Sequence, residues 1–345
     1  MSSAPAQTFK GWVAHDASVA KGNMKWGDYE PKPFEETDIE IEISHCGVCG
    51  TDLHVLSSSW GPSSYPLVVG HEIIGKVSRV GSAVKDLKIG DRSCKRCENG
   101  LEAVCKGFIG TYGAEFQTPK GGKSFGGYAK TWRGPGAFAI SIPEALPSEI
   151  AAPMLCGGVT VYNPLVANGA GPGKRVGVVG IGGLGHFAIL FAKALKCDEV
   201  VAISRSSSKK EDALKLGADE FIATGEDMNW AANNAYCVDI LISTVSGSGF
   251  QTDQYLSLLD ANGILIQVGA PEDPIPAFNA FSLIMGNRKP GGSMIGSRQQ
   301  IKDMFELAAK QNIKSWVQVR PMKDANQVLL DFEDGKPRYR YVLQN

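Results

Sequence analysis

The fold is decided by the stretch Arg175-Val176-Gly177-Val178-Val179-Gly180-Ile181-Gly182-Gly183-Leu184-Gly185. It begins as a short apolar run, typical of a buried strand, and ends in the glycine pattern G-x-G-x-x-G. An apolar helix is expected from Leu184 to Leu195. Glycines at this spacing permit a tight turn and bring a pyrophosphate close to the helix N-terminus. The stretch therefore predicts a dinucleotide site, whose loop residues are Gly180, Gly182, Gly183, Leu184 and Gly185.

Strands and helices alternate along the chain after this loop. Strand-like runs lie at residues 200–203, 221–223, 238–243 and 263–269, and a helix is expected at 211–216. Such alternation is typical of a parallel doubly wound sheet. We therefore predict an α/β protein with a Rossmann nucleotide-binding domain over residues 150–288.

The chain on both sides of this domain has a different pattern. Strand-like runs broken by Gly and Pro fill the first part, as at residues 38–43, 73–80 and 138–143. The tail carries one helix pattern, at 299–311, and ends in a strand-like run at 339–343. We therefore expect the tail to rejoin a β-rich catalytic domain made of residues 1–149 and 289–345.

Composition excludes several classes of partner and location. The 345 residues include 35 Lys plus Arg and 36 Asp plus Glu, which gives no electrostatic reason to expect nucleic acid or an anionic membrane. The N-terminus lacks a secretory pattern, and no apolar run approaches the roughly 20 residues of a membrane helix. Eight cysteines in such a chain favour metal binding over disulfides. We expect a cytoplasmic protein.

The end of the second strand of the nucleotide fold predicts which cofactor binds. It reads Ser204-Arg205-Ser206-Ser207-Ser208-Lys209-Lys210, without the carboxylate that would hold an NAD ribose. Ser204, Arg205 and Lys209 are suitable donors for a 2′-phosphate, and Arg can grip one with a planar fork. The alternative is a solvated basic loop that begins a helix. The sequence favours NADP(H) over NAD.

Three separate stretches supply candidate zinc ligands. Cys49 lies in Gly47-Val48-Cys49-Gly50-Thr51-Asp52-Leu53-His54, His71 and Glu72 follow Gly70, and Cys156 precedes two glycines. Two thiolates and one imidazole are three protein ligands, and a catalytic zinc keeps its fourth position for water or substrate. Cys46 is the rival of Cys49. Zinc together with a dinucleotide points to hydride transfer at a carbonyl.

These stretches also carry a family resemblance. The sequences G-V-C-G-T-D-x-H, P-L-V-V-G-H-E-I-I-G-K-V, M-L-C-G-G-V-T-V-Y and V-V-G-I-G-G-L-G-H resemble those of the zinc-dependent medium-chain alcohol dehydrogenases. The similarity runs over nearly the whole chain, through Lys336-Pro337-Arg338-Tyr339-Arg340-Tyr341, and is closest to the NADP-dependent cinnamyl alcohol dehydrogenase-like branch. It implies a GroES-like first domain and favours Cys49, His71 and Cys156 as the ligands of the catalytic zinc.

The resemblance implies further roles, residue by residue. Glu72 matches a carboxylate beside the metal that can exchange with water as a ligand, and Asp52 matches the group that orients the ligating histidine. Thr51 and His54 match a proton relay from the reacting oxygen to solvent. Thr160 matches a residue beside the nicotinamide, and Trp60 lies where the family lines its substrate pocket. A homodimer joined by edge strands near residues 263–285 is also implied.

One region departs from the family. Its structural zinc is held by a lobe with the spacing C-x2-C-x2-C-x7-C, but here only Cys94, Cys97 and Cys105 are present. About a dozen residues that usually follow Gly90-Asp91-Arg92 are missing with the first cysteine. Three interpretations stay open: zinc held by three cysteines with a carboxylate or water, a metal-free lobe with reactive thiols, or an unnatural gap in the sequence. We favour weak or absent zinc binding.

The sequence thus predicts an NADP(H)-preferring alcohol dehydrogenase with a catalytic zinc. It would mainly reduce aromatic or aliphatic aldehydes to primary alcohols. Two alternatives stay open, a polyol or secondary-alcohol dehydrogenase on the same scaffold and a catalytically inactive NADPH-binding protein.

Overall fold

The chain forms two compact units. The computed structural model describes residues 7–84, 96, 99–118, 120–245 and 247–345. Unit 1 contains Met1–Cys156, Ser297–Phe305 and Trp316–Asn345, and unit 2 contains Gly157–Gly296 and Glu306–Ser315. The predicted divisions, after residues 149 and 288, lay seven and eight residues earlier, and residues 306–315, predicted in the catalytic domain, belong to unit 2.

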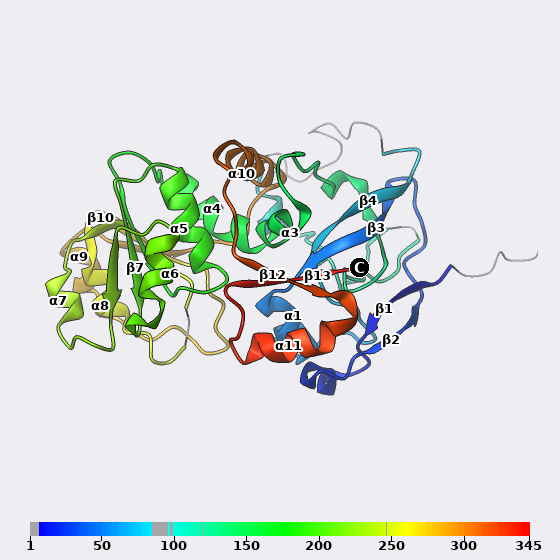
Figure 1. Ribbon diagram of the computed structural model, residues 1–345, viewed down its shortest axis with the longest axis horizontal. Helices are drawn as coiled ribbons and strands as arrows, with labels where there is room; N and C mark the ends of the chain where they lie inside the picture. The colour runs from blue at the N-terminus through cyan, green and yellow to red at the C-terminus, as the bar shows by residue number, and fades with distance from the viewer. Residues whose placement is uncertain (1–6, 85–95, 97–98, 119, 246) are drawn as a thin grey trace, which may run out of the picture. The chain divides into compact units, whose positions relative to one another are not determined.

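Unit 2 is built on a six-stranded sheet in which every neighbouring pair of strands is parallel. Figure 1 shows this sheet between α5 and α6 on one face and α7 and α8 on the other. This is the predicted doubly wound arrangement, and it is confirmed. The elements of unit 2 are α4 (Gly157–Ala167), β6 (Arg175–Val179), α5 (Gly185–Ala194), β7 (Glu199–Ser204), η5 (Ser207–Lys209), α6 (Lys210–Lys215), β8 (Glu220–Ala223), α7 (Trp230–Asn233), β9 (Val238–Ser243), α8 (Thr252–Ser257), β10 (Leu259–Gln267), α9 (Phe281–Ile284) and β11 (Lys289–Gly292).

The strand order places the glycine loop at the reversal point of the sheet. The order is β11-β10-β9-β6-β7-β8, so the chain runs outward from β6 in one direction and from β9 in the other. Ligands of such sheets bind at the carboxyl ends of the strands where the order reverses. The loop that follows β6 at Gly180 lies at this point.

The edge of this sheet differs from our expectation. Residues near 263–285 were expected to supply an edge strand, but 259–267 form β10, which lies between β9 and β11. Among the described strands the edge is β11, whose four residues are all exposed. The reason is that residues 289–292 add a further parallel strand beside Ile264 to Gln267.

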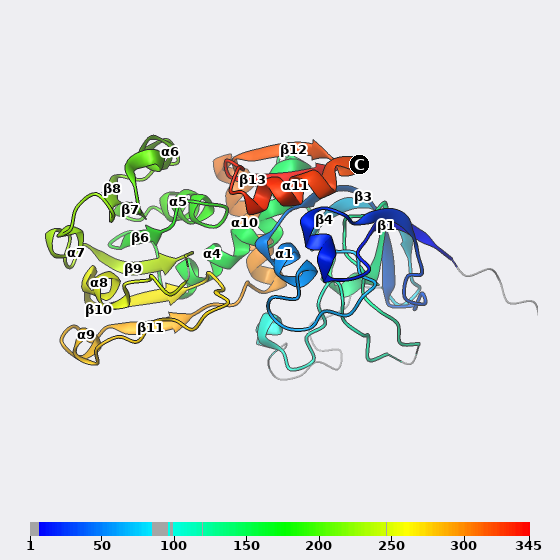
Figure 2. The ribbon, with the colours of Figure 1, turned by 90° about the horizontal axis from the view of Figure 1, so that it is seen from below.

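Unit 1 is mostly β-structure, organised around one long strand. β3 pairs with β4, with β5 and with β13, and β12 extends the sheet beyond β13. Figures 1 and 2 show α11 against β12 and β13. The elements are β1 (Phe9–Val13), η1 (Ala17–Lys21), β2 (Lys25–Tyr29), β3 (Asp38–Gly47), α1 (Gly50–Leu56), β4 (Glu72–Val80), η2 (Glu102–Val104), β5 (Thr131–Pro135), η3 (Gly136–Phe138), α3 (Ser148–Ala151), η4 (Ala152–Leu155), β12 (Val317–Pro321), η6 (Met322–Asp324), α11 (Ala325–Glu333) and β13 (Arg340–Gln344), and α10 (Arg298–Gln311) is shared between the units.

The C-terminal strand completes the sheet that carries the site. Val342, Leu343 and Gln344 of β13 pair antiparallel with Gly47, Cys46 and His45 of β3. The last residues of the chain are therefore held beside the segment that leads to Cys49. The apolar core of this unit includes Leu56, Val69, Tyr128 and Leu329.

The strand predicted at residues 138–143 is wrong. The strand at this point is β5, at Thr131–Pro135, and it ends in the single turn η3. Residues 139–143 have no sheet partner, and Phe138 is 59 % exposed. Their apolar alternation resembled a half-buried strand, but β3 already pairs with the residues just before them.

Two carboxylates of β3, Asp38 and Glu40, are buried. Asp38 forms an ion pair with Lys32, and Glu40 accepts bonds from Arg133 Nε at 3.1 Å and Nη2 at 2.6 Å. Each buried charge therefore has a buried partner of opposite sign, as burial requires.

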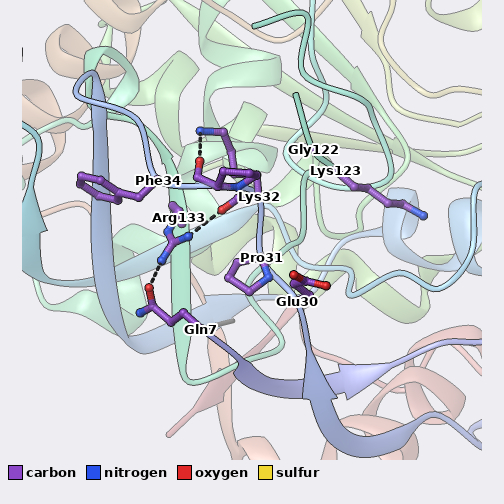
Figure 3. Close-up of a pocket in the computed structure, with 9 residues that line it drawn as sticks. Gln7, Glu30, Pro31, Lys32, Phe34, Gly122, Lys123 and Arg133 are labelled. Atoms are coloured by element: carbon purple, nitrogen blue, oxygen red, sulfur yellow. Dashed lines mark hydrogen bonds between the residues drawn. The ribbon is translucent and has the colours of Figure 1, made fainter. Parts of the chain in front are cut away.

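A surface cavity of unit 1 lies beside these ion pairs. Figure 3 shows Lys32 and Arg133 in its lining, together with Gln7, whose side-chain oxygen accepts a bond from Arg133. Both cations, Lys32 and Arg133, are already paired with carboxylates of β3. The charges of these two side chains therefore belong to structural ion pairs.

Within the described part of the chain, no single helix is both long enough and apolar enough to cross a membrane. One bent pair, Ser148–Leu155 with Gly157–Ala167, meets the criterion by length and composition alone.

Candidate active site

Cys49 lies directly before the first residue of α1, and a side chain of the same helix helps to fix this helix start. β3 ends at Gly47, and α1 begins at Gly50. Asp52, in the first turn, accepts a hydrogen bond from the backbone N–H of Cys49 at 3.0 Å. A carboxylate in this position satisfies an N–H group at the helix start and favours the helix dipole. This hydrogen bond fixes the backbone from which the Cys49 thiol projects.

His71, Glu72 and Cys156 come to the same place from other elements. Glu72 begins β4 and lies opposite Gly47 of β3, while Cys156 follows η4. A Cβ atom at Gly47 would lie 1.8 Å from Glu72 Oε2. Only glycine therefore leaves room for the Glu72 carboxylate.

The four side chains form a cluster whose dimensions fit a zinc ion. The candidate ligand atoms of Cys49, His71, Glu72 and Cys156 all lie within 4.8 Å of one another. The two sulfurs are 4.0 Å apart. Two thiolates bound tetrahedrally at about 2.3 Å from zinc would stand about 3.8 Å apart. Cys46, the rival ligand, is fully buried, and its thiol donates instead to Gly47 O at 3.6 Å.

Interactions within the cluster favour a thiolate at Cys49. A hydrogen bond from the Cys156 thiol lowers the pKa of Cys49 well below its usual value, and His71 adds to this effect. The same hydrogen bond, together with burial, raises the pKa of Cys156. Burial alone would lower the pKa of His71, but Asp52 and Cys49 outweigh it and raise that pKa. Thiolates are the form that binds zinc.

Glu72 is paired with a buried arginine that the sequence analysis did not single out. Arg340 of β13 forms an ion pair with Glu72 through Nη2 and Oε1, and both side chains are almost fully buried. Burial raises the pKa of Glu72 to about 7, although Arg340 acts in the opposite direction. Among the described residues, Glu72 Oε2 has no hydrogen-bond partner. Oε1 of Glu72 is therefore held by Arg340, and Oε2 is available as a ligand atom of the cluster.

Asp52 is fully buried and connects several parts of the site. Its Oδ1 accepts from Gly70 N at 3.1 Å, from the Tyr112 hydroxyl at 2.8 Å and from His71 Nδ1 at 3.2 Å. Its Oδ2 accepts from Cys49 N at 3.0 Å and from the Tyr128 hydroxyl at 3.1 Å. A hydrogen bond at Nδ1 leaves Nε2 as the imidazole nitrogen that would bind a metal.

The two residues expected in a proton relay lie on α1. Thr51 Oγ1 is 3.6 Å from the Cys49 sulfur. His54 Nδ1 is hydrogen-bonded to Ser59 Oγ at 2.8 Å, and its ring stacks on Trp60 with the centroids 4.3 Å apart. Trp60 was expected to line a substrate pocket, which stays a prediction; the structure shows its ring stacked on that of His54.

In unit 2 the glycine loop has the geometry that its pattern predicts. Gly180 has φ +88, which disfavours any residue with a side chain. A Cβ atom at Gly185 would lie 1.8 Å from Gly180 O, so glycine allows the start of α5 to pack against β6. At Gly182 an added Cβ would meet nothing within 4 Å. Its glycine therefore serves no packing need of the protein itself. Gly183 and Leu184 complete the turn into α5.

The turn after β7 carries the expected cations. One carboxylate from another segment, that of Glu226, contacts this turn. Arg205 is exposed, and Lys209 Nζ donates to Ile181 O at 2.7 Å, which ties the turn to the glycine loop. The Glu226 carboxylate accepts a hydrogen bond from the backbone N–H of Ser207 at 2.7 Å and so helps to hold the turn in place. Ser204 ends the strand β7.

Thr160, expected beside the nicotinamide, lies in α4 and is 8 % exposed. It belongs to unit 2 with the glycine loop, whereas the metal cluster belongs to unit 1.

Comparison with known proteins agrees with this chemistry. Residues 35–144 match the model of the alcohol dehydrogenase GroES-like domain, and residues 183–310 match that of the zinc-binding dehydrogenase family. "NADP-dependent alcohol dehydrogenase 6" of Saccharomyces cerevisiae is 38 % identical, with 93 % of this chain and 92 % of the relative covered. The chain is a zinc-dependent alcohol dehydrogenase of the medium-chain family.

Two further comparisons extend over nearly the whole alcohol dehydrogenase. A probable mannitol dehydrogenase of Fragaria ananassa is 40 % identical, covering 96 % of this chain and 94 % of the relative. The solved structure of a cinnamyl alcohol dehydrogenase from Sorghum bicolor is 35 % identical, with a TM-score of 0.90 and 98 % of both chains covered. This likeness confirms the predicted GroES-like and Rossmann architecture and the cinnamyl alcohol dehydrogenase-like branch.

The structural-zinc lobe of this alcohol dehydrogenase is described only in part. Cys94, Cys97 and the sequence gap after Arg92 lie outside the described residues. Cys105 follows η2, is half-buried, and its sulfur accepts from Gly107 N at 3.3 Å. The three interpretations of the lobe therefore stay as predicted.

Sequence reasoning missed three residues of the site, namely Tyr112, Tyr128 and Arg340. For Arg340 there was a signal, because it is a charge inside the apolar run Tyr339-Arg340-Tyr341-Val342-Leu343. A charge in a buried strand needs a partner of opposite sign. The tyrosines had no such signal, because nothing local distinguishes a core tyrosine from one that binds a carboxylate.

Proposed function

We propose that this alcohol dehydrogenase reduces aldehydes to primary alcohols with NADPH and catalyses the reverse reaction with NADP+. Aromatic aldehydes of the cinnamyl type and aliphatic aldehydes are the proposed substrates. The observation that carries the proposal is the donor set of Cys49, His71 and Cys156 at tetrahedral spacing, with Glu72 beside it. A zinc ion bound there would supply a Lewis acid that polarises the aldehyde oxygen.

The protein's own groups then have defined tasks. Asp52 holds His71 in one tautomer and orientation, as the hydrogen bond to Nδ1 supports. Thr51 passes a proton toward the reacting oxygen, and His54, braced by Ser59 and Trp60, exchanges it with solvent. A reduced cofactor held at the glycine loop would supply the hydride.

The preference for NADP(H) is supported by the turn after β7. Ser204, Arg205 and Lys209 offer a hydroxyl and two cations for a 2′-phosphate. Glu226, which follows β8, accepts a hydrogen bond from the Ser207 backbone and so helps to hold this turn. The yeast relative is itself named as NADP-dependent.

A homodimer and a cytoplasmic location complete the proposal. Among the described strands of unit 2, β11 is an exposed edge. Beside it in sequence, Phe281, Ile284 and Met285 are 66, 65 and 78 % exposed, which is apolar surface that a second copy would cover. Replacing Ile284 by Asp should yield a monomer by light scattering. A cytoplasmic location suits a site that depends on reduced thiols, and imaging of a tagged protein tests it.

The first experiment combines native mass spectrometry with kinetics. We expect zinc in the wild-type protein and NADPH oxidation that is much faster with cinnamaldehyde or hexanal than with fructose. Faster turnover of fructose, or of mannitol with NADP+, would favour the alternative of a polyol or secondary-alcohol dehydrogenase. NADPH binding without turnover of any substrate would contradict the proposal.

A further inference from the structure

Two tyrosines hold the carboxylate that connects the zinc-ligand segments. Tyr112 and Tyr128 come from different parts of the chain, 60 and 76 residues from Asp52. Each donates its hydroxyl to a different oxygen of the Asp52 carboxylate. All three side chains are buried, with Asp52 and Tyr128 fully so. The Tyr112 hydroxyl also lies 3.4 Å from His71 Nδ1, and the two ring centroids are 5.8 Å apart.

The two phenols fix the plane of the carboxylate. Each oxygen of Asp52 also accepts one backbone N–H group, Gly70 N on Oδ1 and Cys49 N on Oδ2. Those N–H groups belong to the segments that carry His71 and Cys49. The terminal torsion of a carboxylate is soft, so its plane is set by the donors around it. Without the phenols, only the backbone groups and His71 itself would hold the plane.

We propose that Tyr112 and Tyr128 are positioning residues for zinc, acting through Asp52. They fix the carboxylate that orients His71 and that joins the backbone before His71 to the backbone of Cys49. The inference rests on the proposed metal site. Groups that hold a metal-ligating histidine in this way typically change metal affinity by about 10- to 100-fold when removed.

The test measures zinc affinity by competition with a chromophoric chelator on the full chain. Tyr112→Phe and Tyr128→Phe remove one hydroxyl each and keep the ring. We expect each to weaken zinc binding by about 10-fold and to shift the visible spectrum of the cobalt-substituted protein. Tyr29→Phe is the matched control, because Tyr29 is a buried tyrosine of the same unit whose hydroxyl donates to Thr131 O at 3.1 Å. It should leave the affinity unchanged.

A double-mutant cycle separates action through Asp52 from a general loss of packing. In an Asp52→Asn background Tyr128→Phe should have little further effect on zinc affinity, and Tyr112→Phe should keep only the part that comes from its contact with His71. Full additivity in this cycle, or affinities of both variants within two-fold of wild type, would overturn the proposal. If Tyr128→Phe does not fold, Tyr112→Phe decides, since Tyr112 is the less buried of the two.

The same experiment distinguishes failure of the inference from failure of the proposed function. His71→Ala reports any zinc held outside the proposed cluster. If wild type and His71→Ala bind the same amount of zinc, the proposed metal site itself is wrong. If wild type binds one more zinc than His71→Ala and the tyrosine variants match wild type, only the role of the tyrosines is wrong.

Discussion

The metal cluster of unit 1 and the glycine loop of unit 2 are built in opposite ways. The cluster joins side chains that are far apart in the sequence, such as Cys49 with Cys156 and Glu72 with Arg340. The loop, from Gly180 to Gly185, is one continuous stretch directly after β6 and works through its backbone. The metal cluster depends on charges that balance one another, and the glycine loop depends on the absence of side chains.

This difference has a consequence for mutation. In the cluster every group has a partner whose charge or hydrogen bond would be left unmatched, so substitutions should damage metal binding and stability together. In the loop, cofactor binding and stability should separate from one glycine to the next, because only some of these glycines are required for packing.

The largest expected effect is the loss of activity in His71→Ala. Removing the imidazole leaves the two thiols without the third ligand of the cluster. We expect zinc loss and a fall in kcat/KM of about 10³-fold or more, since Lewis-acid stabilisation is worth several kcal/mol. NADPH affinity, measured by fluorescence, should stay near wild type because the loop belongs to unit 2. His45→Ala, at a half-buried histidine of β3, should retain zinc. Retained activity in His71→Ala would refute the zinc site.

Arg340→Met should cause the largest loss of stability. It leaves the Glu72 carboxylate buried without its cation, and breaking such a pair typically costs about 3–5 kcal/mol. Denaturant unfolding of the metal-free protein measures this. Arg338→Met, two residues earlier and exposed, should change the free energy of unfolding by less than about 0.5 kcal/mol. Equal losses in both variants would mean that the ion pair is not the cause.

Arg205→Asp should change the choice of cofactor. It places a negative charge where a 2′-phosphate is expected, so NADPH binding should weaken by about 100-fold, or about 2.7 kcal/mol. NADH lacks that phosphate and should be little affected, which makes it the internal control. The same weakening for both cofactors would contradict the phosphate assignment.

The smallest expected effect tests the two roles of glycine within the loop. At Gly182 an added Cβ meets nothing in the protein, so Gly182→Ala should keep the melting temperature yet weaken NADPH binding by about 10-fold. Gly185→Ala should lower the melting temperature, because its Cβ would collide with Gly180 O. If Gly182→Ala binds NADPH normally, close approach of the pyrophosphate at that residue is ruled out.

The sequence by itself determined the nucleotide fold and the types of zinc ligand. Alternating apolar runs and a contiguous glycine loop encode local backbone geometry, and local geometry can be predicted from local pattern. The first-domain strand at 138–143 was wrong because pairing is a tertiary property, and β3 had taken residues 131–135 as its partner.

Only the tertiary structure decided which distant groups meet around the ligands. The sheet pairing of β13 with β3 brings Arg340 to Glu72, and two loops bring Tyr112 and Tyr128 to Asp52. No local pattern encodes these contacts, because a buried carboxylate takes its donors from wherever the folded chain places them. The sequence therefore identified the side chains that would bind the metal. The fold determined which other side chains keep them in position.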